Sequence, residues 1–401
     1  MTEQVSPPQQ TETHWWIYRL ALLSAVVYFF SNDNHYVPYD YTFRIAKALF
    51  QGQLGLSSKP PGWLNELVPW NGKYYSVFPL GSVISQVPVT WLAQLSGISR
   101  YPSALVVAAV GALTSVFTFL LAGCYRVSTA QRVALALFVS FGTWTWCNLT
   151  FGGAWQIALG FCLCAQLAAL YFLKARSHPF WIGLMFAIAY GNRTEVILTA
   201  PIYMWLLYRQ DRQRWMYNLG YFCCAPLLLG LATLWYNYAR FFSPLDFGYA
   251  RIPGVLEEPW YKDGIFALSA IPRNFREMLV TPWRSVAGFP WFTPTGFGGS
   301  ILISSPYLLL LVLRFPKQWG MYLLAWLAVV LLTLVLWCHG NPGGWQYSYR
   351  YAMVLIPWFI VMLLETSPEK LEYKDLSLLT ASVLINGFGT YLFHWTDYVR
   401  P

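Results

Sequence analysis

The chain has 401 residues, of which 57% are hydrophobic, 19% aromatic and only 11% charged. About a quarter of the residues in a soluble domain are charged, so this composition excludes an ordinary soluble protein and indicates an integral membrane protein. The net charge of +9 would suggest nucleic-acid binding in a soluble protein. In a membrane protein it follows from basic cytoplasmic loops and anionic lipid, so we expect no nucleic-acid partner.

Long, nearly uncharged apolar runs recur along the chain and predict an all-α polytopic membrane protein. One span needs roughly 20 residues, so the chain can hold about eleven transmembrane helices and the loops between them. We expect a single transmembrane domain over residues 1–401 and no separate soluble domain. The seven cysteines include no CxxC pair and lie mostly in apolar runs, where we expect small buried hydrophobic residues.

The first apolar run, Trp15 to Phe30, is predicted to be a retained span, because polar residues follow it instead of a small-residue cleavage site. After a polar stretch, the apolar segment from Val77 to Leu95 contains Pro79 and Pro88. Because both prolines interrupt helical hydrogen bonding, we place this segment on or partly in the membrane. The further predicted spans are Ser103 to Gly123, Arg132 to Cys147, Gly153 to Leu173, Phe180 to Tyr190, Val196 to Tyr208, Trp215 to Tyr236, Ser300 to Leu313, Trp319 to Trp337, Tyr351 to Leu364 and Leu376 to Phe393.

Twelve of the 26 lysines and arginines lie near the start of the chain or in and beside the short connections between these spans, and in this threading they all fall on one side. The positive-inside rule makes that side cytoplasmic, together with the N-terminus. The loops 31–76, 237–299 and 338–350 then share the outer face, where residues far apart in sequence can meet to form an active site. The basic residues concerned are Arg19, Arg126, Arg132, Lys174, Arg176, Arg209, Arg212, Arg214, Arg314, Lys317, Lys370 and Lys374.

Two aspartates in the first outer loop are candidates for chemistry. Asp33 follows the first span at membrane depth, where partial desolvation would raise its pKa and suit it to act as a general base; the alternative is a polar residue that ends a helix. Asp40 lies in an amphipathic segment, Tyr39 to Phe50, that we expect at the membrane interface. Arg44 and Lys47 stand at helical spacing from Asp40, so a structural ion pair is the alternative to substrate binding.

Two arginines are candidates for binding an anion. Arg350 follows the glycine-rich and aromatic loop 339–349 and directly precedes a span. A guanidinium there suits a phosphate, because it offers two parallel donors and a permanent charge; the alternative is an arginine that only extends to the interface. Arg193 is a second outer cation, although Glu195 is close enough in sequence to neutralise it.

A metal ion held by Asp33, His35 and His339 is conceivable, but their spacing matches no ligand motif, so no metal or other cofactor is assigned. Aromatic residues are frequent in the same loops. They can stack on sugar rings, but they are also typical of a membrane interface. These aromatic candidates are Trp63, Trp70, Tyr74, Tyr75, Trp345 and Tyr347.

Four motifs occur in order on the predicted outer face. They are Asn32-Asp33 followed by the segment 45–52, then the segments 71–80, 236–249 and 343–351. Together they resemble the GT-C class of polyprenyl-phosphate-dependent membrane glycosyltransferases, in particular the bacterial branch related to family 39 mannosyltransferases and lipid A sugar transferases. The chain departs from the usual pattern at Leu80 and Tyr349, where a proline is common.

The resemblance implies a GT-C fold in a bacterial inner membrane. It also implies transfer of a hexose or pentose from a polyprenyl-phosphate donor to a hydroxyl of a lipid, polysaccharide or protein acceptor, with inversion, on the periplasmic face. Asp33 would then be the catalytic base. A flippase or lipid transporter is the alternative, but the predicted spans hold few charges, which favours the enzyme. The residues expected to bind substrate are Asp40, Arg44, Lys73, Tyr74, Tyr75, Arg193, His339, Trp345 and Arg350.

Overall fold

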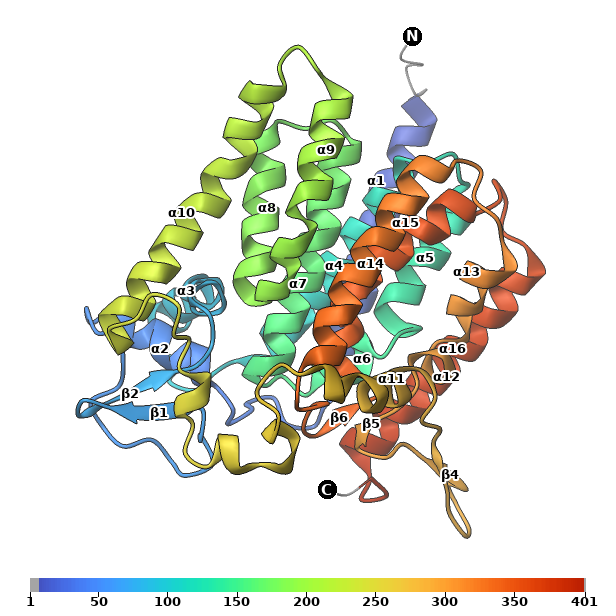
Figure 1. The fold of residues 1–401 in the computed structure, drawn as a ribbon. Helices are drawn as coiled ribbons and strands as arrows, with labels where there is room; N and C mark the ends of the chain where they lie inside the picture. The colour runs from blue at the N-terminus through green and yellow to red at the C-terminus, as the bar shows by residue number, and fades with distance from the viewer. Residues whose placement is uncertain (1–6, 400–401) are drawn as a thin grey trace.

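The computed structural model describes residues 7–399 and is mostly helical. Most of the long helices stand upright side by side, with short strands and long loops gathered at their lower end (Figure 1). Within the described residues, five helices are long and apolar enough to cross a membrane, which supports an integral membrane protein; the predicted number of about eleven spans is not confirmed. The five are α4 (Ser103–Gly123), α7 (Ala154–Lys174), α10 (Trp215–Phe241), α14 (Trp319–Cys338) and α16 (Tyr373–Trp395).

Several predicted spans agree closely with the observed helices. Helix α4 matches its predicted bounds residue for residue, and α7, α10, α14 and α16 differ from theirs by a few residues at their ends. Local signals define some of the starts: the Ser128 hydroxyl accepts a hydrogen bond from the Gln131 backbone N–H at the start of α5. The other helices of this upright group are α1 (Pro7–Phe30), α5 (Thr129–Phe141) and α8 (Pro179–Asn192).

Four predicted spans are divided into shorter elements. In three of them a new helical segment begins around Pro201, Pro306 or Pro357, because proline lacks a backbone N–H and is best tolerated in a first turn. In the fourth, α5 ends at Gly142. Apolar composition alone had not indicated these breaks. The resulting elements are α6 (Thr145–Thr150), η1 (Thr194–Thr199), α9 (Ala200–Gln210), α12 (Ile301–Ser304), η6 (Pro306–Leu309), α13 (Leu310–Leu313), η7 (Arg350–Leu355) and α15 (Ile356–Thr366).

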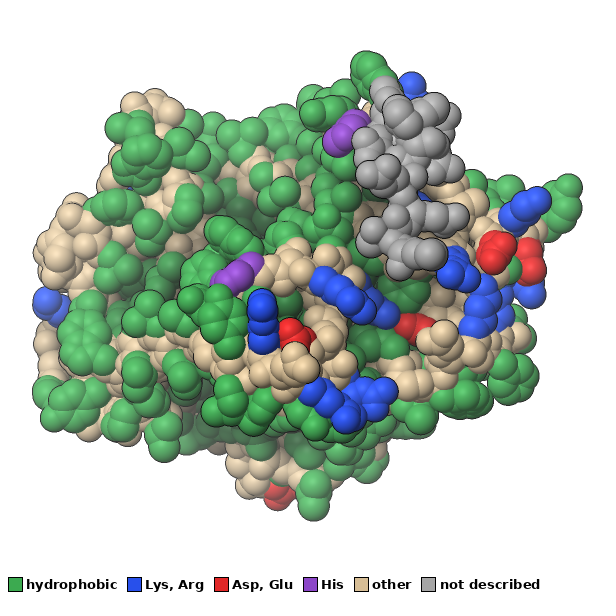
Figure 2. All heavy atoms as spheres, turned by 90° about the horizontal axis from the view of Figure 1, so that it is seen from above, with side chains coloured by type: hydrophobic (Ala, Val, Ile, Leu, Met, Phe, Trp, Pro, Cys, Tyr) green, Lys and Arg blue, Asp and Glu red, His purple; other side chains and the backbone are tan. Residues whose placement is uncertain are grey.

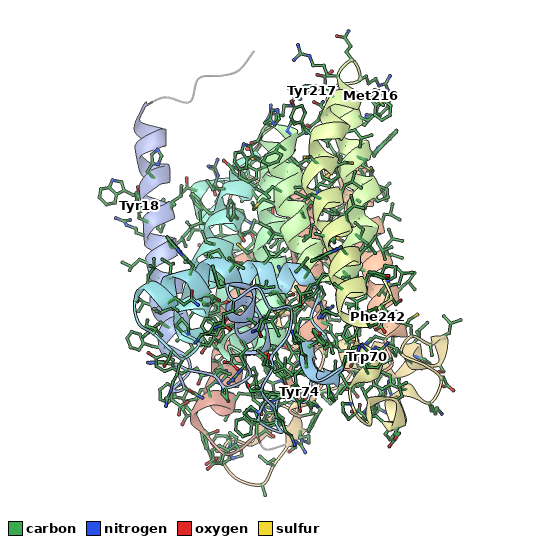
Figure 3. The ribbon with its side chains drawn as sticks, turned by 90° about the vertical axis from the view of Figure 1, so that its left-hand side faces the viewer. Tyr18, Trp70, Tyr74, Met216, Tyr217 and Phe242 are labelled. Atoms are coloured by element: carbon green, nitrogen blue, oxygen red, sulfur yellow. The ribbon has the colours of Figure 1, made fainter. Side chains whose placement is uncertain are left out.

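Helix α3 (Leu80–Leu95) lies crosswise to the upright helices (Figure 3, light blue), which agrees with the expectation that this segment does not cross the membrane. Pro79 is its N-cap, but the helix continues through Pro88, so the expected break at that residue is wrong. Gly81 of α3 packs directly against Gly191 of α8, where a β-carbon would overlap the facing backbone. This close approach fixes the start of α3 beside the lower end of α8.

The lower end of the molecule contains the amphipathic helix predicted over 39–50, observed as α2 (Tyr41–Leu49). Next to it, β1 (Leu67–Trp70) and β2 (Lys73–Ser76) form an antiparallel hairpin. Its turn is Asn71-Gly72, and both residues have positive φ, as a tight hairpin turn requires. The remaining elements of this end are η2 (Tyr249–Arg251), η3 (Val255–Glu257), η4 (Pro259–Tyr261), η5 (Leu268–Ala270), α11 (Ile271–Leu279), β3 (Arg284–Ser285), β4 (Phe292–Thr293), β5 (Phe297–Gly298) and β6 (Gln346–Tyr347).

The main core and the outer surface differ in a way that fits a membrane environment. Every residue of α15 is buried, so this helix lies in the middle of the bundle. Helix α10 instead exposes large apolar side chains along its length, among them Leu228, Leu231 and Trp235. A helix with so little burial and so much apolar surface is suited to contact lipid. Figure 3 shows α10 running from Tyr217 at the upper end down to its C-cap Phe242, with Trp70 and Tyr74 below.

Basic side chains gather at the upper end of the bundle. Figure 2, seen from above, shows groups of lysines and arginines on this face, where the short connections between helices lie. The connection from α9 to α10 contributes Arg212 and Arg214, and the connection from α15 to α16 contributes Lys370. The long loops lie at the other end of the bundle (Figure 1). The short connections and the long loops therefore lie at opposite ends of the bundle (Figure 1).

Candidate active site

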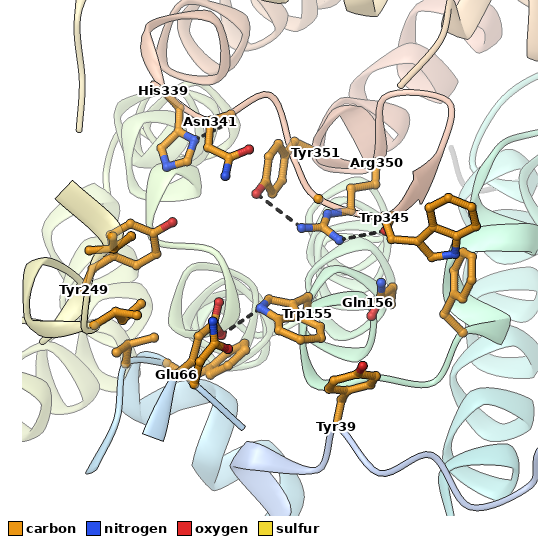
Figure 4. Close-up of a pocket in the computed structure, with 18 of the residues that line it drawn as sticks. Tyr39, Glu66, Trp155, Gln156, Tyr249, His339, Asn341, Trp345, Arg350 and Tyr351 are labelled. Carbon is orange, nitrogen blue, oxygen red and sulfur yellow. Dashed lines mark hydrogen bonds between the residues drawn. The ribbon is translucent and has the colours of Figure 1, made fainter. Parts of the chain in front are cut away.

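The three long loops meet at one cavity of about 990 Å³ at the lower end of the bundle (Figure 4). Backbone pairing ties two of the loops together: β5 pairs with β6, and Phe266 forms a bridge with His339. The ends of α7, α8 and α14 complete the walls. Residues that line the cavity include Tyr39, Trp63 and Glu66 from the first loop, Tyr249 and Phe266 from the second, His339, Trp345 and Arg350 from the third loop and its end, and Trp155, Gln156, Arg193 and Glu195 from the helices.

Glu66 is a half-buried carboxylate in the cavity wall. It immediately precedes β1, and its Oε2 accepts a hydrogen bond of 2.7 Å from Trp155 Nε1. Burial raises the pKa of Glu66 to about 7, although the Trp155 hydrogen bond and the positive charge of Arg350 both act to lower it. A carboxyl group with this pKa changes charge near neutral pH and can accept a proton from a substrate.

Trp155, the partner of Glu66, is itself held in place by other rings. It is the second residue of α7, and its ring lies 5.2 Å from that of Tyr41, 5.4 Å from that of Tyr39 and 6.4 Å from that of Phe78, between centroids. These contacts join α7 to α2 and to the segment before α3. Packing of the indole ring therefore directs its N–H toward Glu66, and no bound ligand is needed to hold it there.

Arg350 is a buried arginine whose charge is not neutralised. Its Nη1 donates to the Trp345 carbonyl oxygen at 3.3 Å and its Nη2 to the Tyr351 hydroxyl at 3.4 Å, both at the long end of hydrogen bonding. Its Nε has no hydrogen-bond partner, and in the described part of the chain no carboxylate lies within 4.0 Å of the guanidinium. A buried cation with free donors favours an anionic ligand.

Arg193, the second cavity arginine, differs from Arg350 because a carboxylate neutralises its charge. Its Nε donates to Glu195 Oε1 at 2.9 Å, as the sequence spacing predicted. The Cζ atoms of Arg193 and Arg350 each lie 5.1 Å from the centre of the Tyr351 ring. The cavity therefore contains two arginines beside one tyrosine, of which one is already paired with a carboxylate and the other is available.

The predicted base, Asp33, does not line the cavity, although Asn32 and Asn34 on either side of it do. Its side chain is exposed, so the expected partial desolvation is found at Glu66 instead of Asp33. The physical reason is that the Asp33 carboxylate is open to solvent, whereas Glu66 is half-buried and hydrogen-bonded to Trp155. The assignment of Asp33 as the catalytic base stays a prediction.

Asp40 and Arg44 form the ion pair expected from their spacing, with Nε and Oδ1 2.6 Å apart. Burial raises the pKa of Asp40, and the hydrogen bond and charge of Arg44 act in the opposite direction. Neither residue lines the cavity. Their predicted contact with substrate stays a prediction, and the observed contact is structural.

Lys73, Tyr74 and Tyr75 lie in β2 and do not line the cavity. The Tyr75 ring packs against Phe241 at 5.7 Å between centroids, and the Tyr74 backbone pairs with Leu56. The structure thus brings four of the predicted binding residues together at the cavity and leaves these three outside its lining. The four that line the cavity are Arg193, His339, Trp345 and Arg350.

The other predicted aromatic and metal-binding residues are also dispersed. Trp63 lines the cavity, Trp70 stacks beneath the Arg251 guanidinium with Cζ 3.9 Å from the ring centre, and Tyr347 is buried. His35 packs on Phe29, with ring centroids 4.7 Å apart. Residues 7–399 contain no group of three or more His, Cys, Asp or Glu side chains arranged to hold a metal ion.

Sequence reasoning missed Glu66, Trp155 and Tyr351. Glu66 resembles any charged loop residue in the sequence, and only its position in the loop rich in motifs could have drawn attention to it. Trp155 begins an apolar helix, where an aromatic residue has many roles. Tyr351 ends the motif segment 343–351 and begins a predicted span, and neither feature predicts a role for it in the site. In each case the contact that matters joins elements far apart in sequence.

Two solved structures are similar to this one, and both are glycosyltransferases of the GT-C class that the motifs resemble. ArnT from Cupriavidus metallidurans bound to undecaprenyl phosphate is 14% identical, with a TM-score of 0.45 over 87% of this chain and 59% of that chain. The oligosaccharyltransferase of Archaeoglobus fulgidus in the apo form is 13% identical, with a TM-score of 0.47 over 95% of this chain and 55% of that chain.

The chain thus spans little more than half the length of either solved structure. At these TM-scores and identities the similarity concerns the arrangement of helices, and it assigns no donor, acceptor or residue role to this chain. No family model matches the sequence, and no curated protein matches it.

Proposed function

We propose that this protein is an inverting glycosyltransferase that moves one monosaccharide from a polyprenyl-phosphate donor to an acceptor hydroxyl. The observation that carries the proposal is that Glu66, with a pKa of about 7, and Arg350, which has no carboxylate partner among the described residues, line the same cavity. Sugar transfer from a lipid phosphate needs a base for the hydroxyl proton and a cation for the leaving phosphate. Both groups are present.

In the proposed reaction, Arg350 binds the donor phosphate through its free donors. The acceptor oxygen attacks the anomeric carbon from the face opposite the phosphate, so a new C–O bond forms as the bond to the phosphate oxygen breaks. Glu66 takes the proton of the acceptor hydroxyl, and the electron pair of the broken bond leaves with the polyprenyl phosphate. Base catalysis of this kind contributes about 100-fold to 10,000-fold in rate, and a cation at the leaving group adds to it.

A lipid donor is supported by the apolar part of the cavity wall. Val335 and Leu336, near the end of the apolar helix α14, line the cavity together with Phe266 of the second loop. A prenyl chain attached to a phosphate at Arg350 would find apolar surface there. The basic upper face supports a cytoplasmic N-terminus, which would put the cavity on the outer, periplasmic side of a bacterial inner membrane.

The base in this proposal is Glu66, and Asp33 is the alternative that the sequence motif favours. Glu66 is preferred because it lines the cavity, has a hydrogen-bonded carboxylate and has a pKa close to the working pH. The acceptor can be a lipid, a polysaccharide or a protein.

The test is sugar transfer by the purified protein in detergent from a panel of radiolabelled polyprenyl-phosphate sugars, with the wild type beside Glu66→Gln. We expect transfer, or slow hydrolysis of one donor, in the wild type and its loss in the variant. Donor binding without turnover under every condition would contradict the proposal and favour a lipid-linked sugar flippase or lipid transporter. In a carrier, Glu66→Gln would be tolerated better than Arg350→Ala.

A further inference from the structure

His339 has a fixed tautomer that leaves one ring nitrogen free. Its Nδ1 lies 2.8 Å from the carbonyl oxygen of Asn341. A carbonyl oxygen can only accept, so Nδ1 carries the proton and donates it. In the neutral ring, Nε2 then holds a lone pair and is a hydrogen-bond acceptor. Among the described residues, no group donates a hydrogen bond to Nε2.

The backbone around His339 is held on both sides by the second loop. Gly340 N–H donates to Ile265 O and Ala267 N–H donates to Cys338 O, both at 2.8 Å. The Asn274 side chain of α11 donates to the carbonyl oxygen of His339 at 2.7 Å. These bonds fix the position of the ring before any ligand binds, as a recognition residue requires.

Aromatic side chains enclose the imidazole and leave it open toward the cavity. The rings of Tyr249, Tyr261, Phe266 and Tyr351 lie with their centroids 5.4 to 6.3 Å from that of His339, at steep interplanar angles of 66° to 80°. The hydroxyls of Tyr249 and Tyr261 form a hydrogen bond of 2.6 Å with each other, and neither is hydrogen-bonded to a ring nitrogen of His339. Figure 4 shows His339 pointing into the cavity that it lines.

We propose that Nε2 of His339 accepts a hydrogen bond from a hydroxyl of the donor sugar and thereby selects the sugar that is transferred. The inference rests on the proposed function, because it uses Arg350 as the phosphate site. Tyr351 contacts both groups: its hydroxyl accepts from Arg350, and its ring packs against that of His339. A sugar attached to a phosphate at Arg350 therefore lies within reach of Nε2. His339 is a specificity residue in this scheme and takes no proton in the reaction.

The charges around His339 keep it in the accepting form. Burial lowers the pKa of the imidazole, the positive charges of Arg193 and Arg350 lower it further, and the Asn341 carbonyl and Glu195 act in the opposite direction. Burial raises the pKa of Tyr249 and of Tyr261, which face the imidazole, so both are uncharged at neutral pH. With its pKa lowered, the ring stays neutral in more acidic solution than an ordinary imidazole, and we expect its role in sugar recognition to weaken only in acid.

The tautomer is tested by ¹⁵N nuclear magnetic resonance on histidine-labelled protein in detergent. The chain has five histidines, and His339→Phe identifies the signal of interest while keeping an aromatic ring in the enclosure. We expect an unprotonated Nε2 whose resonance moves when a short-chain prenyl phosphate sugar is added. A protonated Nε2, or a resonance unaffected by a donor that binds, would overturn the proposal.

Specificity is tested with the same donor and its monodeoxy analogues. In the wild type, removal of one particular hydroxyl should raise KM about tenfold, the effect of one lost neutral hydrogen bond. His339→Phe should raise KM for the parent donor by a similar factor, with kcat little changed. In this variant the parent donor and that deoxy analogue should have nearly the same KM. His339→Gln, which retains an acceptor, should keep part of the discrimination.

Discrimination that is unchanged in His339→Phe would overturn the proposal even if the enzyme is active. Failure of the wild type to transfer any sugar would instead reject the proposed function, and the two failures are therefore distinguishable. Thermal unfolding of both variants controls for misfolding, and His339→Gln keeps the test valid if the phenylalanine variant does not fold.

Discussion

Glu66 and Asp33 belong to the same loop, but their surroundings make them chemically different. Glu66 lies against Trp155 of α7 and lines the cavity, and burial raises its pKa to about 7. Asp33 lies in the motif that resembles an active site. Its side chain is nevertheless exposed, and its two neighbours, Asn32 and Asn34, line the cavity while Asp33 does not. The comparison shows that the side chains packed over a carboxylate, and not the motif around it, decide whether it can serve as a base near neutral pH.

The largest expected effect separates these two residues directly. Glu66→Gln should lower kcat for sugar transfer by about 100-fold to 10,000-fold, because the neutral amide cannot accept the hydroxyl proton. Asp33→Asn should keep activity close to that of the wild type. The measurement is steady-state transfer of labelled sugar by both variants side by side. The reverse result, loss in Asp33→Asn alone, would restore Asp33 as the base and contradict the role of Glu66.

The second prediction concerns the charge that faces Glu66. Arg350→Ala should raise the KM for the lipid donor by about 10-fold to 100-fold, the range for hydrogen bonds to a charged group. Arg212→Ala, in the connection at the opposite end of the bundle, is a matched control and should leave KM unchanged. Equal effects of the two substitutions would mean that general electrostatic attraction to the lipid, and not a phosphate site at Arg350, determines donor affinity.

The third prediction uses the pH dependence of Glu66. As a base, Glu66 acts in its deprotonated form, so kcat/KM should rise with pH through a midpoint near its pKa of about 7. Trp155→Phe removes the hydrogen bond that stabilises the carboxylate, so this midpoint should move to higher pH. Trp235→Phe on the exposed side of α10 should not move it. A midpoint unaffected by Trp155→Phe would show that another group titrates.

The smallest expected effect is on stability. Because folding raises the pKa of Glu66 above its ordinary value of 4.5, its contribution to stability is fully present below that value and is lost as the pH rises through about 7. Glu66→Gln stays uncharged, so above pH 7 it should exceed the wild type in unfolding free energy by about 1 to 3 kcal/mol. Thermal unfolding at pH 5 and pH 8 measures this; a difference in Tm that does not grow with pH would contradict the buried charge.

The sequence by itself determined where apolar helices lie and which loops belong together. The run from Ser103 to Gly123 is long, apolar and bounded by breakers, so its helix followed from composition alone. Counting spans and basic residues predicts that three loops share one face, namely 31–76, 237–299 and 338–350. These loops do meet at one cavity. Arg350 and His339 were found because they stand in motifs next to a span.

Only the tertiary structure decided which of the polar loop residues face each other. Glu66 and Trp155 are 89 positions apart in sequence, and their contact exists because α2 and the hairpin of β1 and β2 pack against the start of α7. Likewise, Arg193 and Arg350 meet at Tyr351 because α8 ends and η7 begins at the same wall. Burial, and with it the pKa of a carboxylate or the availability of an arginine, depends on neighbours from distant segments, and local sequence patterns do not contain that information.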